Sequence, residues 1–161
     1  MMKRPKTALA VWVLTSSHGA WAPILVFGLH VIFSRVLGAY IAFPRLDVPM
    51  HFFGGMAITY FLGYVFAVAA AVGFLGLPNR TVLLLLTFFT ACSAAVFWEF
   101  TEFLSDSFLG THAQLGLNDT LSDMLLGMVG ALVYLAANRF RLPVVSLTRI
   151  EPQPEAARDN A

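Results

Sequence analysis

The chain has 161 residues, of which 58% are hydrophobic and 12% are charged, and its mean hydropathy is +0.76. Soluble domains carry about 25% charged residues, so this composition excludes an ordinary water-soluble globule. The formal net charge of +1 gives no reason to expect a nucleic-acid partner, and the single cysteine, Cys92, excludes an intrachain disulfide and a cysteine-based zinc site.

Long uncharged stretches predict a membrane protein. Most of them are long enough, or nearly so, to cross roughly 30 Å of hydrocarbon. The stretches without Asp, Glu, Lys or Arg are 7–34, 48–79, 81–98 and 124–138. We therefore expect an all-α fold, a four-helix transmembrane bundle over residues 20–138, with membrane lipid as its surroundings.

The N-terminal residues 1–19 form a basic segment that we expect to be cytoplasmic. Residues 8–16 are predicted to lie as a short interfacial helix, followed by a first membrane helix at about 20–36 with Pro23 in its first turn. The segment resembles a signal peptide, but cleavage would leave the basic end of the last helix outside, against the preference of basic residues for the cytoplasm. An uncleaved first helix fits better.

Three further helices are expected at about 48–74, 81–104 and 120–138. Pro78-Asn79 breaks the chain between the first two of them, and a stretch containing Gly and Asn precedes the last. Residues 139–161 are rich in proline and scattered charges, which predicts a largely disordered cytoplasmic tail.

The distribution of basic residues predicts the orientation. With a cytoplasmic N-terminus, eight Lys and Arg residues lie inside and only Arg35 and Arg45 lie outside. Both termini are then cytoplasmic, and every acid before the tail lies at the outer end of the bundle.

Polar residues on three helices continue into stripes of small residues, since residues three and four apart share a helix face. Small residues let membrane helices approach closely, so we expect these stripes to face one another. They are Asp47, His51, Gly55, Thr59 and Gly63 on the second helix, Ala91, Ala95, Glu99, Glu102 and Asp106 on the third, and Asp119, Asp123, Gly127, Gly130 and Ala131 on the fourth.

The stripes predict a polar site at membrane depth. His51, Glu99 and Asp123 each fall roughly 4–8 Å below the outer interface. Ionisable groups at this depth are candidate functional groups by default. Nitrogen and oxygen donors of this kind suit a divalent metal ion, whose identity the spacing does not select. The candidate ligands are His51, Glu99, Asp123, Asp47 and Asp119; Glu102 is the candidate general base, and Arg35 and Asp106 complete the polar cluster.

Structural roles compete with this interpretation. Asp47 could be the N-cap of its helix, and Asp123 could form a capping box with Thr120. Asp106 and Asp119 could be solvated carboxylates at loop edges. Arg35 could pair with Glu99 or Glu102 in an ion-pair network, and His51 could be a satisfied buried histidine.

Other polar and aromatic residues have simpler interpretations. His30 stands alone on an apolar helix, which indicates a packing role or an interfacial position. Trp98, Tyr40 and Tyr60 are typical of lipid-facing and interfacial residues.

The stretches LDVPMHFFGG, WEFTE and NDTLSDMLLGMVGA together resemble the VanZ-like small membrane proteins and their YjdF-type relatives. The resemblance covers roughly residues 45–135. It matches the family's Asp-x-x-x-His with Asp47 and His51, its Glu with Glu99, and its last-helix Asp with Asp123. Val48 and Gly127 stand where the family usually has Lys and Asn. The resemblance implies a multi-pass protein of the bacterial inner membrane.

We therefore predict an envelope protein whose outward-facing site binds a divalent cation or a cationic group. Three alternatives remain open. They are a metal-dependent enzyme acting on a lipid-linked substrate, an ion- or proton-coupled transport component that would work as a homo-oligomer, and a structural accessory protein.

Overall fold

The computed structural model describes residues 7–138, and all regular structure in that range is helical. The predicted N-terminal basic residues 3, 4 and 6 and the predicted disordered tail 139–161 lie outside the described residues. The elements are α1 (Ala8–Ser17), α2 (Trp21–Val31), a π-helical turn (Ile32–Val36), α3 (Ala39–Ala42), a 3₁₀ turn (Pro44–Leu46), α4 (Asp47–Ala71), α5 (Arg80–Leu109) and α6 (Leu117–Asn138).

Three of the described helices are long and apolar enough to span a membrane. They are Pro44–Ala71, which includes the 3₁₀ turn, Arg80–Leu109 and Leu117–Asn138. A fourth span is obtained if Ala8–Ser17 and Trp21–Val36 count as one helix bent by 47°. The all-α architecture is confirmed, with three to four candidate spans; the sides of the membrane on which the chain begins and ends stay a prediction.

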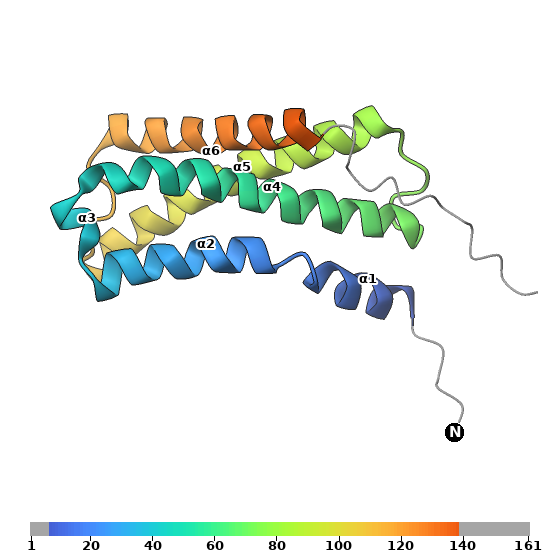
Figure 1. The fold of residues 1–161 in the computed structure, drawn as a ribbon, viewed down its shortest axis with the longest axis horizontal. Coiled ribbons are helices and arrows are strands. Elements are labelled where there is room, and N and C mark those ends of the chain that lie inside the picture. The colour runs from blue at the N-terminus through green and yellow to red at the C-terminus, as the bar shows by residue number, and fades with distance from the viewer. Residues whose placement is uncertain (1–6, 139–161) are drawn as a thin grey trace, which may run out of the picture.

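The bent pair runs along α4 (Figure 1). In α1, the Trp12 indole nitrogen donates to the backbone oxygen of Val65 at 3.3 Å, and the Trp12 ring meets Phe74 edge-on at 5.9 Å. In α2, the Trp21 indole donates to the Tyr60 hydroxyl at 3.2 Å. The predicted helix at 20–36 is thus present with a π-helical end, and the helix predicted at 8–16 is present as Ala8–Ser17.

Glycines hold α4 and α6 against each other. A Cβ at Gly55 would lie 2.1 Å from the backbone oxygen of Gly127, and a Cβ at Gly130 would lie 2.1 Å from the backbone oxygen of Phe52. No side chain fits at such distances, so the two backbones touch only because these positions lack a Cβ. The predicted stripes of small residues are therefore the contact surfaces, with Thr59 and Ala131 fully buried beside them.

The helices that carry the acids all end or begin near α3. Figure 1 shows the start of α4, the end of α5 and the start of α6 at that end of the bundle. α5 continues five residues beyond its predicted end, to Leu109, and its C-cap is Gly110, whose φ of +65° is a left-handed conformation that glycine adopts without strain. α6 begins three residues earlier than predicted, at Leu117.

Candidate functional site

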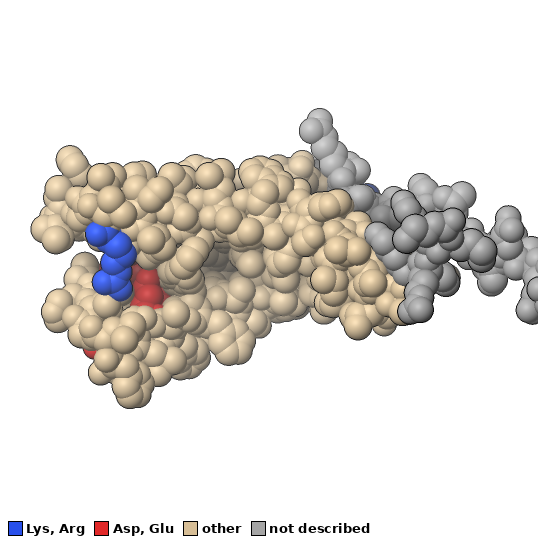
Figure 2. Space-filling view, turned by 90° about the horizontal axis from the view of Figure 1, so that it is seen from below, with Lys and Arg blue, Asp and Glu red and all other residues tan. Residues whose placement is uncertain are grey.

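Five ionisable side chains meet at the α3 end of the bundle. Asp47 and His51 come from the first turns of α4, Glu99 and Glu102 from the C-terminal half of α5, and Asp123 from the second turn of α6. We call these five residues the acid–histidine cluster. Figure 2 shows acidic side chains recessed at one end of this face, next to basic side chains, while the rest of the described face is almost uncharged.

His51 lies at the centre of the cluster, with its side chain only 10% exposed. Its Nε2 atom is 3.3 Å from Asp47 Oδ1 and 3.9 Å from Asp123 Oδ2. Its Nδ1 atom is 3.8 Å from Glu99 Oε1. The two ring nitrogens therefore face carboxylates on opposite sides of the imidazole.

Glu99 is 5% exposed, and neither of its carboxylate oxygens accepts a hydrogen bond within the described residues. Its backbone oxygen, in contrast, accepts a hydrogen bond from the Gln114 side-chain amide at 3.0 Å. A buried carboxylate without hydrogen-bond donors is costly, because burial removes its hydration and nothing replaces it. Among the described residues, Glu99 is thus the acid of the cluster whose buried carboxylate oxygens lack a hydrogen-bond donor.

Glu102 is also buried, but it has a partner. Its Oε1 atom accepts a hydrogen bond from the indole nitrogen of Trp98 at 2.8 Å, one turn earlier on α5. The prediction that Trp98 faces lipid is therefore wrong, because its ring is half-buried and its polar atom is used inside the bundle. Its position at the membrane interface stays a prediction. The i,i+4 spacing of Trp98 and Glu102 was the available signal for this contact.

The two capping interpretations are also wrong. Asp47 is the first residue of α4, the N-cap is Leu46, and no side chain caps that helix end. Asp123 lies inside α6 and is 4% exposed. It does not cap Thr120, because α6 begins earlier and the Thr120 backbone N–H donates to the Gly116 oxygen. Both carboxylates are free to face His51.

Two of the predicted polar residues lie apart from the cluster, at loop edges. The Asp106 carboxylate accepts hydrogen bonds from the Thr111 hydroxyl and from the backbone N–H groups of Ala113 (2.8 Å) and Gln114 (3.0 Å), so it orders the loop after α5. The Asp119 carboxylate accepts one from the Leu115 N–H at 3.1 Å. Both are partly exposed, as their structural interpretation predicted.

Arg35 is exposed in the π-helical turn and forms no ion pair with an acid of the described chain. The predicted ion-pair network with Glu99 or Glu102 is therefore not formed. Figure 2 shows basic side chains beside the acidic ones at this end, where Arg35 and Arg45 are the described basic residues.

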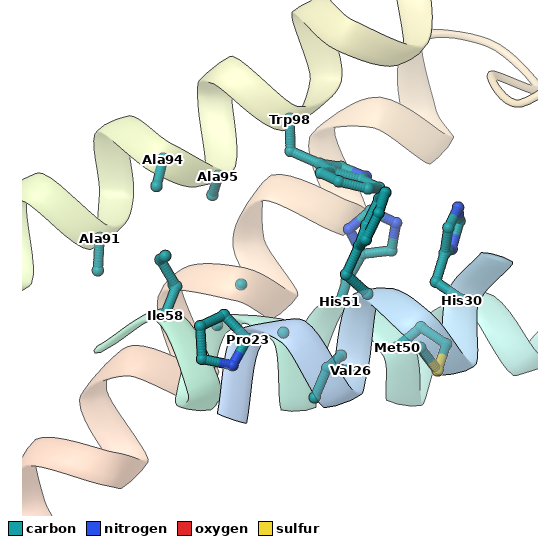
Figure 3. Close-up of a pocket in the computed structure, with 14 residues that line it drawn as sticks. Pro23, Val26, His30, Met50, His51, Ile58, Ala91, Ala94, Ala95 and Trp98 are labelled. Carbon is teal, nitrogen blue, oxygen red and sulfur yellow. The ribbon is translucent and has the colours of Figure 1, made fainter. Parts of the chain in front are cut away.

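A cavity of about 230 Å³ opens beside His51, and no sequence pattern indicated it. α2, α4 and α5 supply most of its wall, and the lining is largely apolar, including Pro23, Val26, Ile58, Ala91 and Ala94. In Figure 3, His51, Trp98 and His30 lie together at one end of the cavity, and Pro23, Ile58 and Ala91 lie toward the other.

His30 is fixed at the rim of this cavity. Its Nδ1 atom lies 3.0 Å from the Tyr40 hydroxyl, and its ring meets the Trp98 ring edge-on at 5.3 Å. The packing role predicted for His30 is confirmed, whereas Tyr40, predicted as an interfacial residue, is its hydrogen-bond partner.

The donor atoms of the cluster are close enough for an ion. Two groups each offer three donor atoms that lie within 4.8 Å of one another: Asp47, His51 and Asp123, and His51, Glu99 and Glu102. Metal–donor bonds of about 2.0–2.6 Å place two donors on one ion at most roughly 4–5 Å apart. Either group could close on a divalent cation with small side-chain movements.

Comparison with known proteins gives a family and no activity. A Thermotoga maritima protein described as uncharacterized is 29% identical over 103 residues, which is 63% of this chain and 52% of that protein, so the chain spans about half the length of this relative. No solved structure matches. Residues 6–142 match the model of the family described as predicted membrane protein (DUF2238). That match covers most of the chain, which therefore belongs to the DUF2238 family of predicted membrane proteins.

Proposed function

We propose that this membrane protein binds a divalent cation through His51, Glu99 and Glu102. The observation that carries the proposal is Glu99: both of its carboxylate oxygens are buried, neither accepts a hydrogen bond within the described residues, and the Nδ1 of His51 lies 3.8 Å from Oε1. A cation bound between these groups would supply the coordination that the carboxylate lacks.

The surroundings of the three ligands support this choice over the group around Asp47. Metal-bound histidines usually present their second ring nitrogen to a carboxylate, which fixes the ring. Asp47, 3.3 Å from His51 Nε2, is placed for that role and leaves Nδ1 facing Glu99. The Trp98 indole fixes the Glu102 carboxylate in a comparable way.

The charge of the acid–histidine cluster also favours a cation. Four carboxylates lie beside one imidazole, so even a fully protonated His51 leaves a formal excess of three negative charges. No arginine of the described chain pairs with these acids. A divalent ion with nitrogen and oxygen ligands would offset most of that excess at membrane depth.

Thermal unfolding in detergent tests the proposal. We expect one of Zn²⁺, Mn²⁺ or Ca²⁺ to raise the Tm of the chelator-treated protein, because a ligand present at 100 times its Kd stabilises by about 2.7 kcal/mol. A change of this size corresponds to roughly 5–10 °C.

Matched variants locate the ion. Asp119→Asn, outside the cluster, should keep the full increase in Tm, and Glu99→Gln should lose it. Asp47→Asn should weaken binding about 10–100-fold, as changes to the outer partner of a metal ligand do. Equal increases in Glu99→Gln and Asp119→Asn would show that the ion binds elsewhere.

We also propose a narrower family relationship and a cellular location for this protein. The motifs around Asp47, Glu99 and Asp123 support a relationship to the VanZ-like and YjdF-type proteins, and with it a location in the bacterial inner membrane.

A hydrolytic enzyme is the second candidate. Its support is the position of Glu102, a fixed carboxylate within the proposed ligand set and near an apolar cavity.

A further inference from the structure

The apolar cavity beside His51 differs from ordinary packing defects because it runs along the bundle. Between His51 and Ile58, α4 rises by about 10 Å, and Ala91 and Trp98 span the same length on α5. One end of the cavity is thus at the acid–histidine cluster, and the other lies about 10 Å deeper among aliphatic side chains (Figure 3).

The cavity is open space rather than a gap that a neighbour fills. A Cβ at Gly54, which lines it, would meet no atom within 4 Å. The next residue, Gly55, is pressed against the backbone of α6. The glycine at position 54 is therefore not required for helix packing, and its missing side chain leaves room in the cavity.

We propose that the cavity binds one hydrocarbon chain of a phospholipid from the surrounding bilayer, with the lipid phosphate at the His51 end. The polarity gradient carries the proposal. The cavity has titratable groups at one end and aliphatic groups at the other, which is the arrangement of a lipid in the leaflet nearest the cluster. Its volume, below the roughly 300–1,000 Å³ of sites for drug-sized ligands, and its length of about 10 Å suit the headgroup-proximal part of one chain and not a whole lipid.

A basic side chain lies near one end of the cavity in the chain. Arg35 stands five residues after His30, which lines the cavity, is exposed, and forms no ion pair with an acid of the described chain. A phosphate placed between an arginine and a bound cation is held by two positive charges. This part of the inference rests on the proposed cation site, whereas the binding of the chain does not.

Native mass spectrometry of the purified protein with added phosphatidylglycerol tests the inference. We expect one retained lipid per chain in the wild type. Gly54→Leu, which fills the cavity from α4, should lower lipid affinity about tenfold, the effect of displacing roughly two buried methylene groups. Ala94→Leu fills the cavity from α5 and should lower lipid affinity in the same way. It provides a second test in case Gly54→Leu folds poorly.

Gly28→Leu is the matched control. A Cβ there also meets no atom within 4 Å, but Gly28 does not line the cavity. It should bind the lipid as the wild type does. A phosphatidylglycerol with six-carbon chains has the same headgroup, but its chains are too short to fill the cavity. It should therefore bind weakly to all variants. Equal binding of the long-chain lipid by Gly28→Leu and by both cavity-filling variants would overturn the inference.

Metal content measured on the same samples separates the two proposals. A Gly54→Leu protein that keeps its metal and loses the lipid supports both. Lipid binding that depends on Gly54 in a protein without any metal would contradict the cation site and leave the chain site supported.

Discussion

At the scale of single residues, hydrogen bonding separates the buried acid that lacks a partner from the acids that already have one. Asp106 and Asp119 accept hydrogen bonds from loop backbone groups, and Glu102 accepts one from Trp98. The Glu99 carboxylate accepts none within the described chain. A sequence shows that an acid stands at membrane depth, but only the positions of neighbouring donors show whether it is satisfied.

Glu99→Gln separates a binding role from a structural one. In the presence of a chelator we expect the variant to be more stable than the wild type by about 1 kcal/mol or more, because it replaces a buried, unpartnered carboxylate by a neutral amide. In the presence of the bound cation the order should reverse. Denaturation curves in both buffers check this. A variant that is less stable than the wild type in both would identify Glu99 as part of a structural network.

Asp106→Asn should loosen the loop between α5 and α6. The amide of this variant keeps one acceptor oxygen where the carboxylate serves three donors, so we expect a loss of about 1–2 kcal/mol locally. Hydrogen exchange of residues 110–116 should accelerate, while bound metal stays unchanged. Loss of metal in this variant would place Asp106 in the site, contrary to its observed partners.

At the scale of helices, the close contact of α4 with α6 follows from small residues at helical spacing. That contact was predictable, because the stripes that contain Gly55, Gly127 and Gly130 can be recognised from the spacing within each helix alone. The cavity was not predictable, because it depends on how α2 is placed beside α5. The start of α6 was missed because Leu117 precedes the polar residues that resemble a helix cap.

Two adjacent glycines give a direct test of the helix contact. Gly55→Ala would place a methyl group 2.1 Å from a backbone oxygen of α6, which forces the helices apart, and we expect a loss of about 1–3 kcal/mol or failure to fold. Gly54→Ala should be neutral or stabilising by up to about 1 kcal/mol, because alanine favours the helix. Thermal unfolding of the two variants should therefore differ. The same Tm for both would mean that α4 and α6 are not in backbone contact.

At the scale of the whole molecule, the four acids and the histidine of the cluster lie at the α3 end of the bundle, where α4 and α6 begin and α5 ends (Figure 1). The basic residues predict that this end faces outward. Two exposed loop positions test the orientation in a Cys92→Ala background: Leu115 between α5 and α6, and Leu77 between α4 and α5.

With a membrane-impermeant maleimide, Leu115→Cys should be labelled in intact cells, and Leu77→Cys only after the membrane is permeabilised. Labelling in the reverse order would place the acid–histidine cluster on the cytoplasmic side. The helix packing would then stand, but the predicted orientation would be wrong.

The central claim is that the cluster holds a divalent cation, and the metal content of the purified protein tests it most directly. Elemental mass spectrometry should find about one equivalent of a divalent metal per chain in the wild type and in Asp119→Asn. His51→Ala and Glu99→Gln should contain almost none while keeping the helical circular dichroism of the wild type. A wild-type protein without metal after incubation with Zn²⁺, Mn²⁺ or Ca²⁺ would contradict the claim, as would equal metal content in all four proteins.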